Sequence, residues 1–220
     1  KTLDAVRELL RQGRLDEART LAQAGLVATP RYAGPYLPLC TLFLRFEGRG
    51  EVTDYRRELD IGSAVARTTF TKDGVHFTRE YIASYPANVI AIRLTADQPG
   101  VISLYASMMR RPYDPGTRIT PEGRLLMQGR ATDGGVEYDC MVEARAEGGV
   151  IETIGDTLHI SRADSATIYV ASDTSFRGAF PEAECALTLN NAPDYDKLLA
   201  EHLHAGTMHQ QLLSGKAGAD

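Results

Sequence analysis

The side chains best placed to do chemistry in this chain are two nearby carboxylates, Glu58 and Asp60. Acid–base hydrolysis of a glycosidic bond uses two carboxyl groups about 5 to 10 Å apart, so a pair of this kind has to be weighed. Alternate residues of a strand share a face, which would project both carboxylates together and place Arg57 on the other side. The competing interpretation is a solvated or ion-paired strand edge near a turn, and we favour it.

Arg79 and Glu80 are adjacent charges inside a segment that is otherwise rich in apolar and aromatic residues. Neighbouring residues of a strand face opposite sides of the sheet, so these two side chains are not expected to pair with each other. Each is expected to meet a charge on an adjacent strand or a backbone group. A structural ion pair is favoured over a ligand site.

Three of the five histidines, His202, His204 and His209, cluster late in the chain. On a helix His202 and His209 lie two turns apart on one face while His204 points elsewhere, which matches no common zinc motif. His76 and His159 fall in strand patterns and are expected to be structural. The sequence therefore predicts no metal site and no cofactor.

The three cysteines are Cys40, Cys140 and Cys185. They are odd in number and lack metal-ligand spacing, so neither a disulfide framework nor a zinc site is indicated. Buried free thiols are the expectation.

Other catalytic patterns are missing from the sequence. There is no glycine-rich phosphate loop, and Ser84 and Ser172 lack the flanking glycines of a nucleophile elbow. Aromatic residues make up only 7% of the chain and tryptophan is absent, which weakens a site that stacks sugars on exposed rings. Tyrosines in or near loops are the available substitutes: Tyr32, Tyr36, Tyr105 and Tyr113. We assign no catalytic residue.

The composition indicates one folded domain with helical appendages. Hydrophobic residues make up 43% and charged residues 24%, and the net charge of −5 is spread without a run of Lys and Arg. Nucleic acid is therefore an unexpected partner. No stretch approaches the roughly 18 apolar residues of a membrane span. No leader opens the chain, although an excised leader would leave no trace.

The elements that must position these residues change in kind along the chain. Apolar residues repeat at helical spacing over residues 2–26, and Gly13 is expected to separate two short helices. Beyond residue 36 the pattern becomes short β-branched and aromatic runs between turn residues, which predicts an antiparallel β-sandwich. The predicted strands span 39–46, 64–70, 74–85, 89–95, 101–108, 124–130, 136–146, 150–154 and 166–171.

Strand 74–85 is expected to be central, with Lys72-Asp73-Gly74 as its hairpin turn. Residues 112–123 predict a long exposed loop because they hold three prolines and two glycines. After Pro193 the pattern returns to a helix capped near Asp194. One face of that helix carries Tyr195, Leu198, Leu199 and Leu203.

The order of several motifs resembles the N-terminal domain of glycoside hydrolase family 95. The helical lead Val6-Arg7-Glu8-Leu9-Leu10 is followed by Tyr36-Leu37-Pro38-Leu39 and by Tyr55-Arg56-Arg57-Glu58-Leu59-Asp60-Ile61. Thr78-Arg79-Glu80-Tyr81-Ile82-Ala83-Ser84-Tyr85-Pro86 and Asn88-Val89-Ile90 complete the succession. Cys40-Thr41 departs from it, because the family usually has Gly-Asp there. Residues 202–213 follow its linker helix only loosely.

The resemblance implies a β super-sandwich with an N-terminal helix pair over 2–26 and a C-terminal linker helix. The expected domain covers residues 1–193, followed by linker and tail over 194–220. The family's first strands, and the (α/α)6 barrel that holds its catalytic groups, are expected to lie outside this sequence. The expected parent enzyme hydrolyses terminal α-L-fucosyl bonds with inversion and is secreted or periplasmic.

The role implied for this domain is to pack against and shape that barrel, its expected partner, while carbohydrate is met only indirectly. The isolated chain is expected to be inactive and to self-associate through surfaces that the barrel would cover, above all the final helix. Two alternatives stay open, a stand-alone carbohydrate-binding or lectin-like sandwich and a structural or assembly domain.

Overall fold

The computed structural model describes residues 1–27, 37–130, 132, 134–178 and 180–213, with side chains described up to residue 206 of the last helix. The chain divides into two compact units, Lys1–Tyr36 and Leu37–Asp220. None of the helices in the described ranges combines the length and hydropathy needed to cross a membrane.

The first unit is a helix pair, α1 (Thr2–Arg11) and α2 (Leu15–Gly25). Gly13 joins them with a φ of 73°, a left-handed conformation that favours glycine. The amide of Arg14 then donates to the carbonyl of Leu9, which closes the end of α1. Val6 and Ala18 are the buried side chains of this unit. The predicted helix pair and its glycine stop are confirmed.

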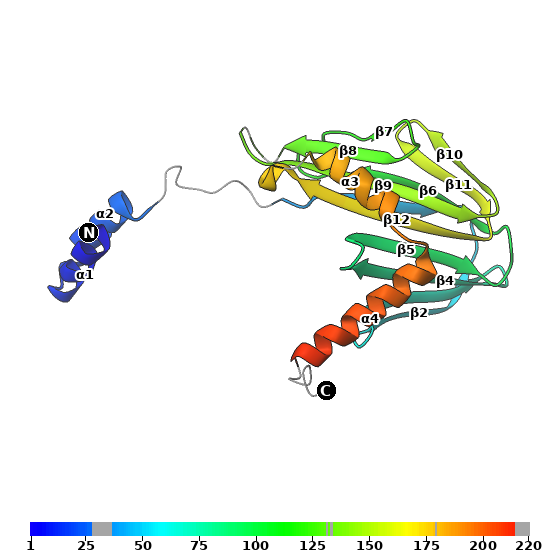
Figure 1. Cartoon of the computed structure of the whole chain (residues 1–220), viewed down its shortest axis with the longest axis horizontal. Coiled ribbons are helices and arrows are strands. Elements are labelled where there is room, and N and C mark those ends of the chain that lie inside the picture. The colour runs from blue at the N-terminus through cyan, green and yellow to red at the C-terminus, as the bar shows by residue number, and fades with distance from the viewer. Residues whose placement is uncertain (28–36, 131, 133, 179, 214–220) are drawn as a thin grey trace. The chain divides into compact units, whose positions relative to one another are not determined.

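The second unit is an antiparallel sandwich of two sheets (Figure 1). Its strands are β1 (Thr41–Phe46), β2 (Val52–Asp60), β3 (Val65–Lys72), β4 (Val75–Ser84), β5 (Val89–Ala96), β6 (Ile102–Met109), β7 (Arg118–Ile119), β8 (Leu125–Arg130), β9 (Glu137–Glu147), β10 (Val150–Ile154), β11 (Thr157–Ala163) and β12 (Ser165–Thr174). The small sheet has the order β1-β6-β11-β10, and the large sheet has the order β2-β3-β4-β5-β12-β9-β8-β7. The mainly β fold class is confirmed.

Strand β4 lies inside the large sheet, between β3 and β5. Its hairpin to β3 turns at Asp73 and Gly74, whose φ angles of 52° and 77° are those of a tight two-residue turn. Phe77 and Tyr81 both pack toward the core between the sheets, so they share a face as the alternation predicts.

The main core fills the space between the sheets. Leu94, Leu125 and Ile168 of the large sheet are at most 2% exposed, and they face Leu104 and Ile160 of the small sheet. These residues alternate with outward-facing neighbours along each strand, which is the pattern of an aligned sandwich. We call this side of the large sheet its inner face.

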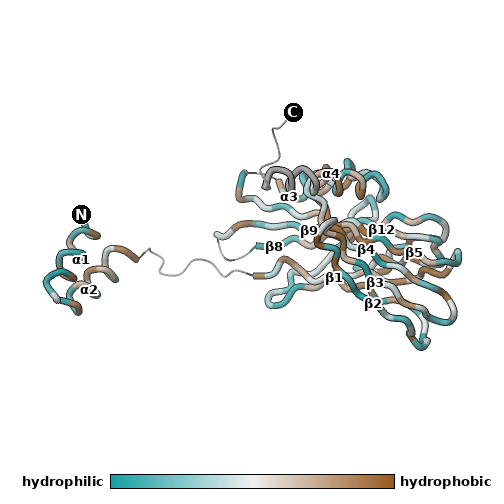
Figure 2. The backbone as a smooth tube through the Cα atoms, turned by 90° about the horizontal axis from the view of Figure 1, so that it is seen from below, coloured by the Kyte–Doolittle hydropathy of each residue, from teal (hydrophilic) through white to brown (hydrophobic). Residues whose placement is uncertain are grey.

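Two helices cover the outer face of the large sheet, α3 (Pro181–Asn191) and α4 (Tyr195–Leu213), as Figure 2 shows. Tyr195 and Leu198 are 5% and 0% exposed in a second core with Tyr169, whose hydroxyl donates to the carbonyl of Pro193. The first residues of the apolar stripe of α4, Tyr195, Leu198 and Leu199, therefore pack within the same unit, whereas Leu203 is 39% exposed. Self-association through this helix stays a prediction.

The structure adds elements to the predicted list. Strand β2 is missing from the predicted strands because charged residues replace apolar alternation at the sheet edge. Strand β11 is missing because its short strand pattern directly follows a turn. Strand β7 interrupts the predicted loop 112–123, where Arg118 and Ile119 pair with Leu126 and Leu125. Helix α3 precedes the predicted helical onset, and its sequence signal is Pro181, a proline suited to a first helical turn.

We expect Leu198→Ala to destabilise the second unit by about 2 to 5 kcal/mol, because it empties a fully buried site between α4 and the large sheet. The matched change Leu203→Ala, on the same helix but 39% exposed, should cost far less. Urea unfolding followed by circular dichroism measures both. Equal losses for the two variants would mean that α4 does not pack on the sheet through Leu198.

Candidate functional site

The predicted carboxylate pair lies at the edge of the large sheet, on β2. One carboxylate oxygen of Glu58 lies 2.6 Å from a guanidinium nitrogen of Arg56, and the other lies 3.6 Å from a guanidinium nitrogen of Arg67. Asp60 accepts hydrogen bonds from the hydroxyl of Ser63 and from the amide of Gly62, and these bonds hold its pKa below the usual range. Both carboxylates serve the ion-paired edge and its turn, which agrees with the structural interpretation.

Arg79 and Glu80 face opposite sides of the sheet, as expected. Glu80 accepts a hydrogen bond of 2.6 Å from Arg67 on the adjacent strand and one of 3.3 Å from the hydroxyl of Tyr195. The predicted cross-strand ion pair is therefore present for Glu80, and it also anchors the start of α4.

Arg79 has a different partner from the charge expected for it. Its guanidinium carbon lies 3.6 Å from the ring centroid of Phe46 and 4.7 Å from that of Phe70. Burial lowers the pKa of Arg79, although a guanidinium stays charged. A cation between two aromatic rings joins the two sheets here, because Phe46 belongs to β1 and Phe70 to β3.

The histidines take structural positions where they are described. His202 is buried and its Nε2 lies 2.9 Å from the carbonyl oxygen of Ser63. His159 stacks on Tyr105 and lies 3.0 Å from Glu47, on the solvent side of the small sheet. His204 and His76 are exposed, and the side chain of His209 falls outside the described residues.

The cysteines are free thiols, but only two of the three are buried. Cys140 and Cys185 are buried, whereas Cys40 is half-buried. The expectation of three buried thiols is thus wrong for Cys40, because this residue lies before β1, at the edge of the sandwich. Within the described ranges, no group of three or more histidine, cysteine or acidic side chains is arranged to hold a metal ion.

The main hollow of the second unit lies on the inner face of the large sheet. The small sheet does not reach β2, and a groove of about 690 Å³ opens there. Its inner-facing lining residues, which define what we call the open groove, are Tyr55, Arg57, Leu59, Ala66, Thr68, Arg79 and Tyr81. Tyr55 and Leu59 are 59% and 64% exposed. The groove offers rings, a hydroxyl and guanidinium groups, which suit binding rather than acid–base catalysis.

Tyr55 and Tyr81 are not among the tyrosines predicted as candidate binding residues, because both lie in strands and not in loops. Tyr105 is stacked on His159, Tyr113 is exposed on a turn, and Tyr32 and Tyr36 fall outside the described residues. The available signal was alternation, because Tyr55, Arg57 and Leu59 share one face of a strand.

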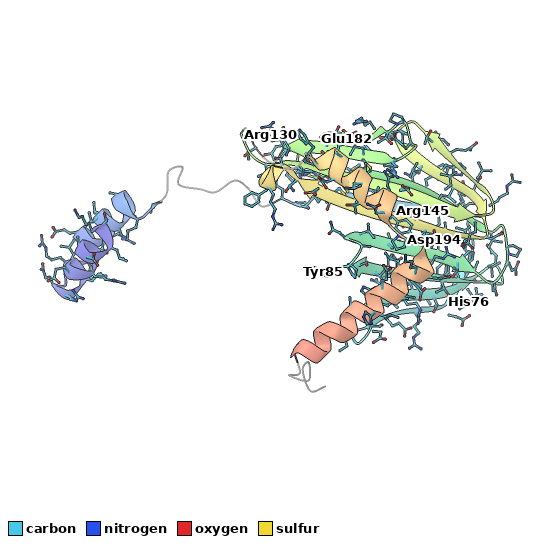
Figure 3. All side chains as sticks on the ribbon, viewed as in Figure 1. His76, Tyr85, Arg130, Arg145, Glu182 and Asp194 are labelled. Atoms are coloured by element: carbon cyan, nitrogen blue, oxygen red, sulfur yellow. The ribbon has the colours of Figure 1, made fainter. Side chains whose placement is uncertain are left out.

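A second polar cluster lies where α3 begins, near Arg130 and Glu182 in Figure 3. Gln128 donates from one side-chain nitrogen to both Asp139 and Glu182, at 3.1 Å each. Asp139 is only 5% exposed, and this burial raises its pKa, with the nearby Glu182 adding to the rise. The cluster holds two carboxylates but ties both to the same amide, so they are positioned as structural groups.

The far end of α3 is held by Arg145, which lies near Asp194 in Figure 3. Its guanidinium donates to the carbonyl oxygens of Leu189 and Ala192 at 2.9 and 2.8 Å. A cation at a helix C-terminus satisfies carbonyls that have no partner within the helix and opposes the negative end of its dipole. Arg145 also pairs with Glu143 at 2.6 Å, so this polar site fixes the helix on the sheet.

The fold and its polar sites define a β-sandwich domain whose surfaces suit contact with another molecule or domain. The comparison with protein families makes this specific. The chain belongs to the family described as glycosyl hydrolase family 65, N-terminal domain, whose model matches residues 1–179.

Two curated relatives are fucosidases by name. Alpha-L-fucosidase 2 of Arabidopsis thaliana is 27% identical over 183 residues, covering 68% of this chain and 22% of the relative. Probable alpha-fucosidase A of Aspergillus oryzae is 23% identical over 150 residues, covering 66% of this chain and 21% of the relative. The chain thus spans about a fifth of the length of these relatives.

A solved structure shares the fold. A putative kojibiose phosphorylase from human microbiome superposes with a TM-score of 0.54 at 10% identity, covering 76% of this chain and 27% of that one. Together these findings establish an N-terminal domain of the glycosyl hydrolase class, related to fucosidases. The matching family model is the family 65 one, so the prediction of a glycosyl hydrolase N-terminal domain is confirmed, whereas its assignment to family 95 is not.

We expect Asp139→Asn to stabilise the fold at neutral pH by on the order of 1 kcal/mol, because it removes a buried charge while keeping an acceptor for Gln128. The folded pKa of Asp139 is raised, so the stability of the unsubstituted chain is fully present below its unfolded pKa of about 3.9 and falls as pH rises through the folded pKa. The advantage of Asn should therefore vanish below that range.

Urea unfolding from pH 3 to 7 measures this difference. Glu51→Gln is the control, because Glu51 is an exposed carboxylate before β2 and its replacement should give no such pH dependence. A pH-independent difference between Asp139→Asn and the unsubstituted chain would show that Asp139 carries no buried charge.

Proposed function

We propose that this chain is the non-catalytic N-terminal domain of a family 95-like glycoside hydrolase, an inverting enzyme that removes terminal α-L-fucosyl groups. Its role is to pack against the catalytic (α/α)6 barrel of that enzyme and to shape its pocket. The observation that carries the proposal is the match of residues 1–179 to the family of N-terminal domains. The chain also spans only about a fifth of the length of its fucosidase relatives.

Two further observations support a fucosidase over a phosphorylase as the parent enzyme. The curated relatives that match the sequence are both fucosidases by name, whereas the phosphorylase is similar in fold at 10% identity. The motif succession around Glu58 and Glu80 also resembles family 95. In this structure those carboxylates hold the sheet edge and the start of α4, which is the work of a supporting domain.

We expect the isolated chain to hydrolyse an aryl α-L-fucoside no faster than buffer, because the candidate carboxylates Glu58 and Asp60 are committed to structural contacts. Enzymatic catalysis of such a reaction spans many orders of magnitude, so even a weak true activity is measurable. Release of 4-nitrophenol is followed for the chain, for Glu58→Gln and for Asp60→Asn, with an active α-L-fucosidase as positive control. Turnover that either substitution abolishes would overturn the non-catalytic assignment.

One observation favours a second candidate function, a carbohydrate-binding domain. The open groove carries Tyr55 and Tyr81 on one face beside Arg57, and Arg57 has no ion pair among the described residues. Tyrosine rings stack on sugars and guanidinium groups bind their hydroxyls, so this face can bind a sugar without catalysing a reaction on it.

If the groove binds carbohydrate, we expect Tyr55→Ala to weaken binding of fucosylated oligosaccharides up to about tenfold, because one aromatic contact contributes about 0.5 to 1.5 kcal/mol. Tyr113→Ala is the matched control, since Tyr113 is 77% exposed and outside the groove. Isothermal titration calorimetry measures both variants. Light scattering on the same samples tests self-association, and self-association that Tyr55→Ala abolishes, without sugar binding, would favour the assembly role instead.

A further inference from the structure

Two thiols from different sheets meet at the edge of the main core. Cys40 lies directly before β1 in the small sheet, and Cys140 lies within β9 of the large sheet. Their sulfur atoms are 3.5 Å apart although the residues are 100 positions apart in the sequence. A disulfide needs the two sulfurs to approach to about 2.0 Å, so the pair has to close by about 1.5 Å from its present contact.

The two thiols differ in access and in their ease of ionisation. Cys140 is 0% exposed in the core, whereas Cys40 is half-buried and so can be reached from solvent. The contact with the sulfur of Cys140 lowers the pKa of Cys40, while the same contact and burial raise the pKa of Cys140. Cys40 is therefore the thiol that ionises first and meets a reagent first.

A buried cation lies beside the segment that carries Cys40. Arg110 is 4% exposed, and its Nε donates to the carbonyl oxygen of Pro38 at 3.1 Å. Its guanidinium also stacks on the ring of Tyr138, 4.4 Å from the centroid. These contacts fix the chain just before Cys40 and so help to hold its thiol beside Cys140.

The third cysteine provides an internal comparison. Cys185 lies in α3 and packs in the second core, between the helices and the large sheet. Cys140 lies in the main core, so the backbone of the large sheet separates the two thiols. Burial raises the pKa of Cys185 to about 12. A thiol of this kind is unreactive and has no cysteine partner on its side of the sheet.

We propose that Cys40 and Cys140 form a thiol–disulfide exchange site, which closes to a cross-sheet disulfide when the domain meets a small-molecule disulfide. The Cys40 thiolate attacks one sulfur of the reagent, whose S–S bond breaks and releases one thiolate. The Cys140 thiol then attacks the Cys40 sulfur and passes its proton to the departing half of the reagent, which leaves as the second thiol. Two protein thiols are oxidised, and one disulfide is reduced to two thiols.

The test incubates the folded, reduced chain with oxidised glutathione, quenches with an alkylating reagent and maps the products by mass spectrometry. We expect one product, with Cys40 linked to Cys140 and Cys185 alkylated. Cys185→Ser should give the same link, and Cys40→Ser should abolish it. Cys140→Ser should stop at a glutathione adduct on Cys40, which separates the attacking thiol from the resolving one.

A second readout does not depend on any variant. The oxidised chain should unfold at higher urea than the reduced chain, and dithiothreitol should reverse the difference, because the link joins the two sheets. The same oxidation in concentrated urea should give mixed pairings among the three cysteines. The proposal would be overturned if all three cysteines of the native chain were still alkylated after the incubation, or if Cys185 formed the disulfide instead.

Discussion

The large sheet has to bury two faces with layers that are each smaller than itself, and the rest of the structure follows from this constraint. The small sheet of four strands covers the inner face from β4 toward β8, and two helices cover the outer face. Because the small sheet does not extend over the inner side of β2 and the adjoining part of β3, rings and guanidinium groups stay in contact with solvent there. The covered faces of the large sheet hold the domain together, and the uncovered face is the surface that can contact another molecule.

Charged side chains hold the seams between these layers. Arg79 lies between aromatic rings of the two sheets, and Glu80, next to it in sequence, binds Arg67 and Tyr195 on the opposite face. Arg145 holds the end of α3 in the same way. Each charge is paired, stacked or capped, since an unpaired buried charge would cost more than the packing around it contributes. The carboxylate of Glu80 therefore serves a structural contact at such a seam.

Much of this fold can be read from the sequence because period-two alternation and turn residues set the strands independently of distant contacts. The hairpin at Asp73 and Gly74 and the glycine stop at Gly13 are examples. Strand β2 escapes such an analysis, because nearly all of its side chains are exposed at the sheet edge and no buried face imposes apolar alternation. The open groove escapes it too, since Tyr55 becomes a candidate only once the small sheet is seen to end before β2. The contact of Cys40 with Cys140 depends on the packing of one sheet on the other, which no local sequence pattern encodes.

The pairing pattern also gives the domain an order of assembly. Strands β2 to β5 form a meander in which each strand pairs with the next through a short turn, so their contacts close small loops. The small sheet must instead join Thr41 to Met109 and Leu104 to Ile160, across long stretches of chain. Such contacts carry the larger entropy cost, and they form slowly. A nascent chain therefore exposes the inner face of its meander until β6 and β11 arrive, and in that interval the domain is most open to mispairing with another copy of itself.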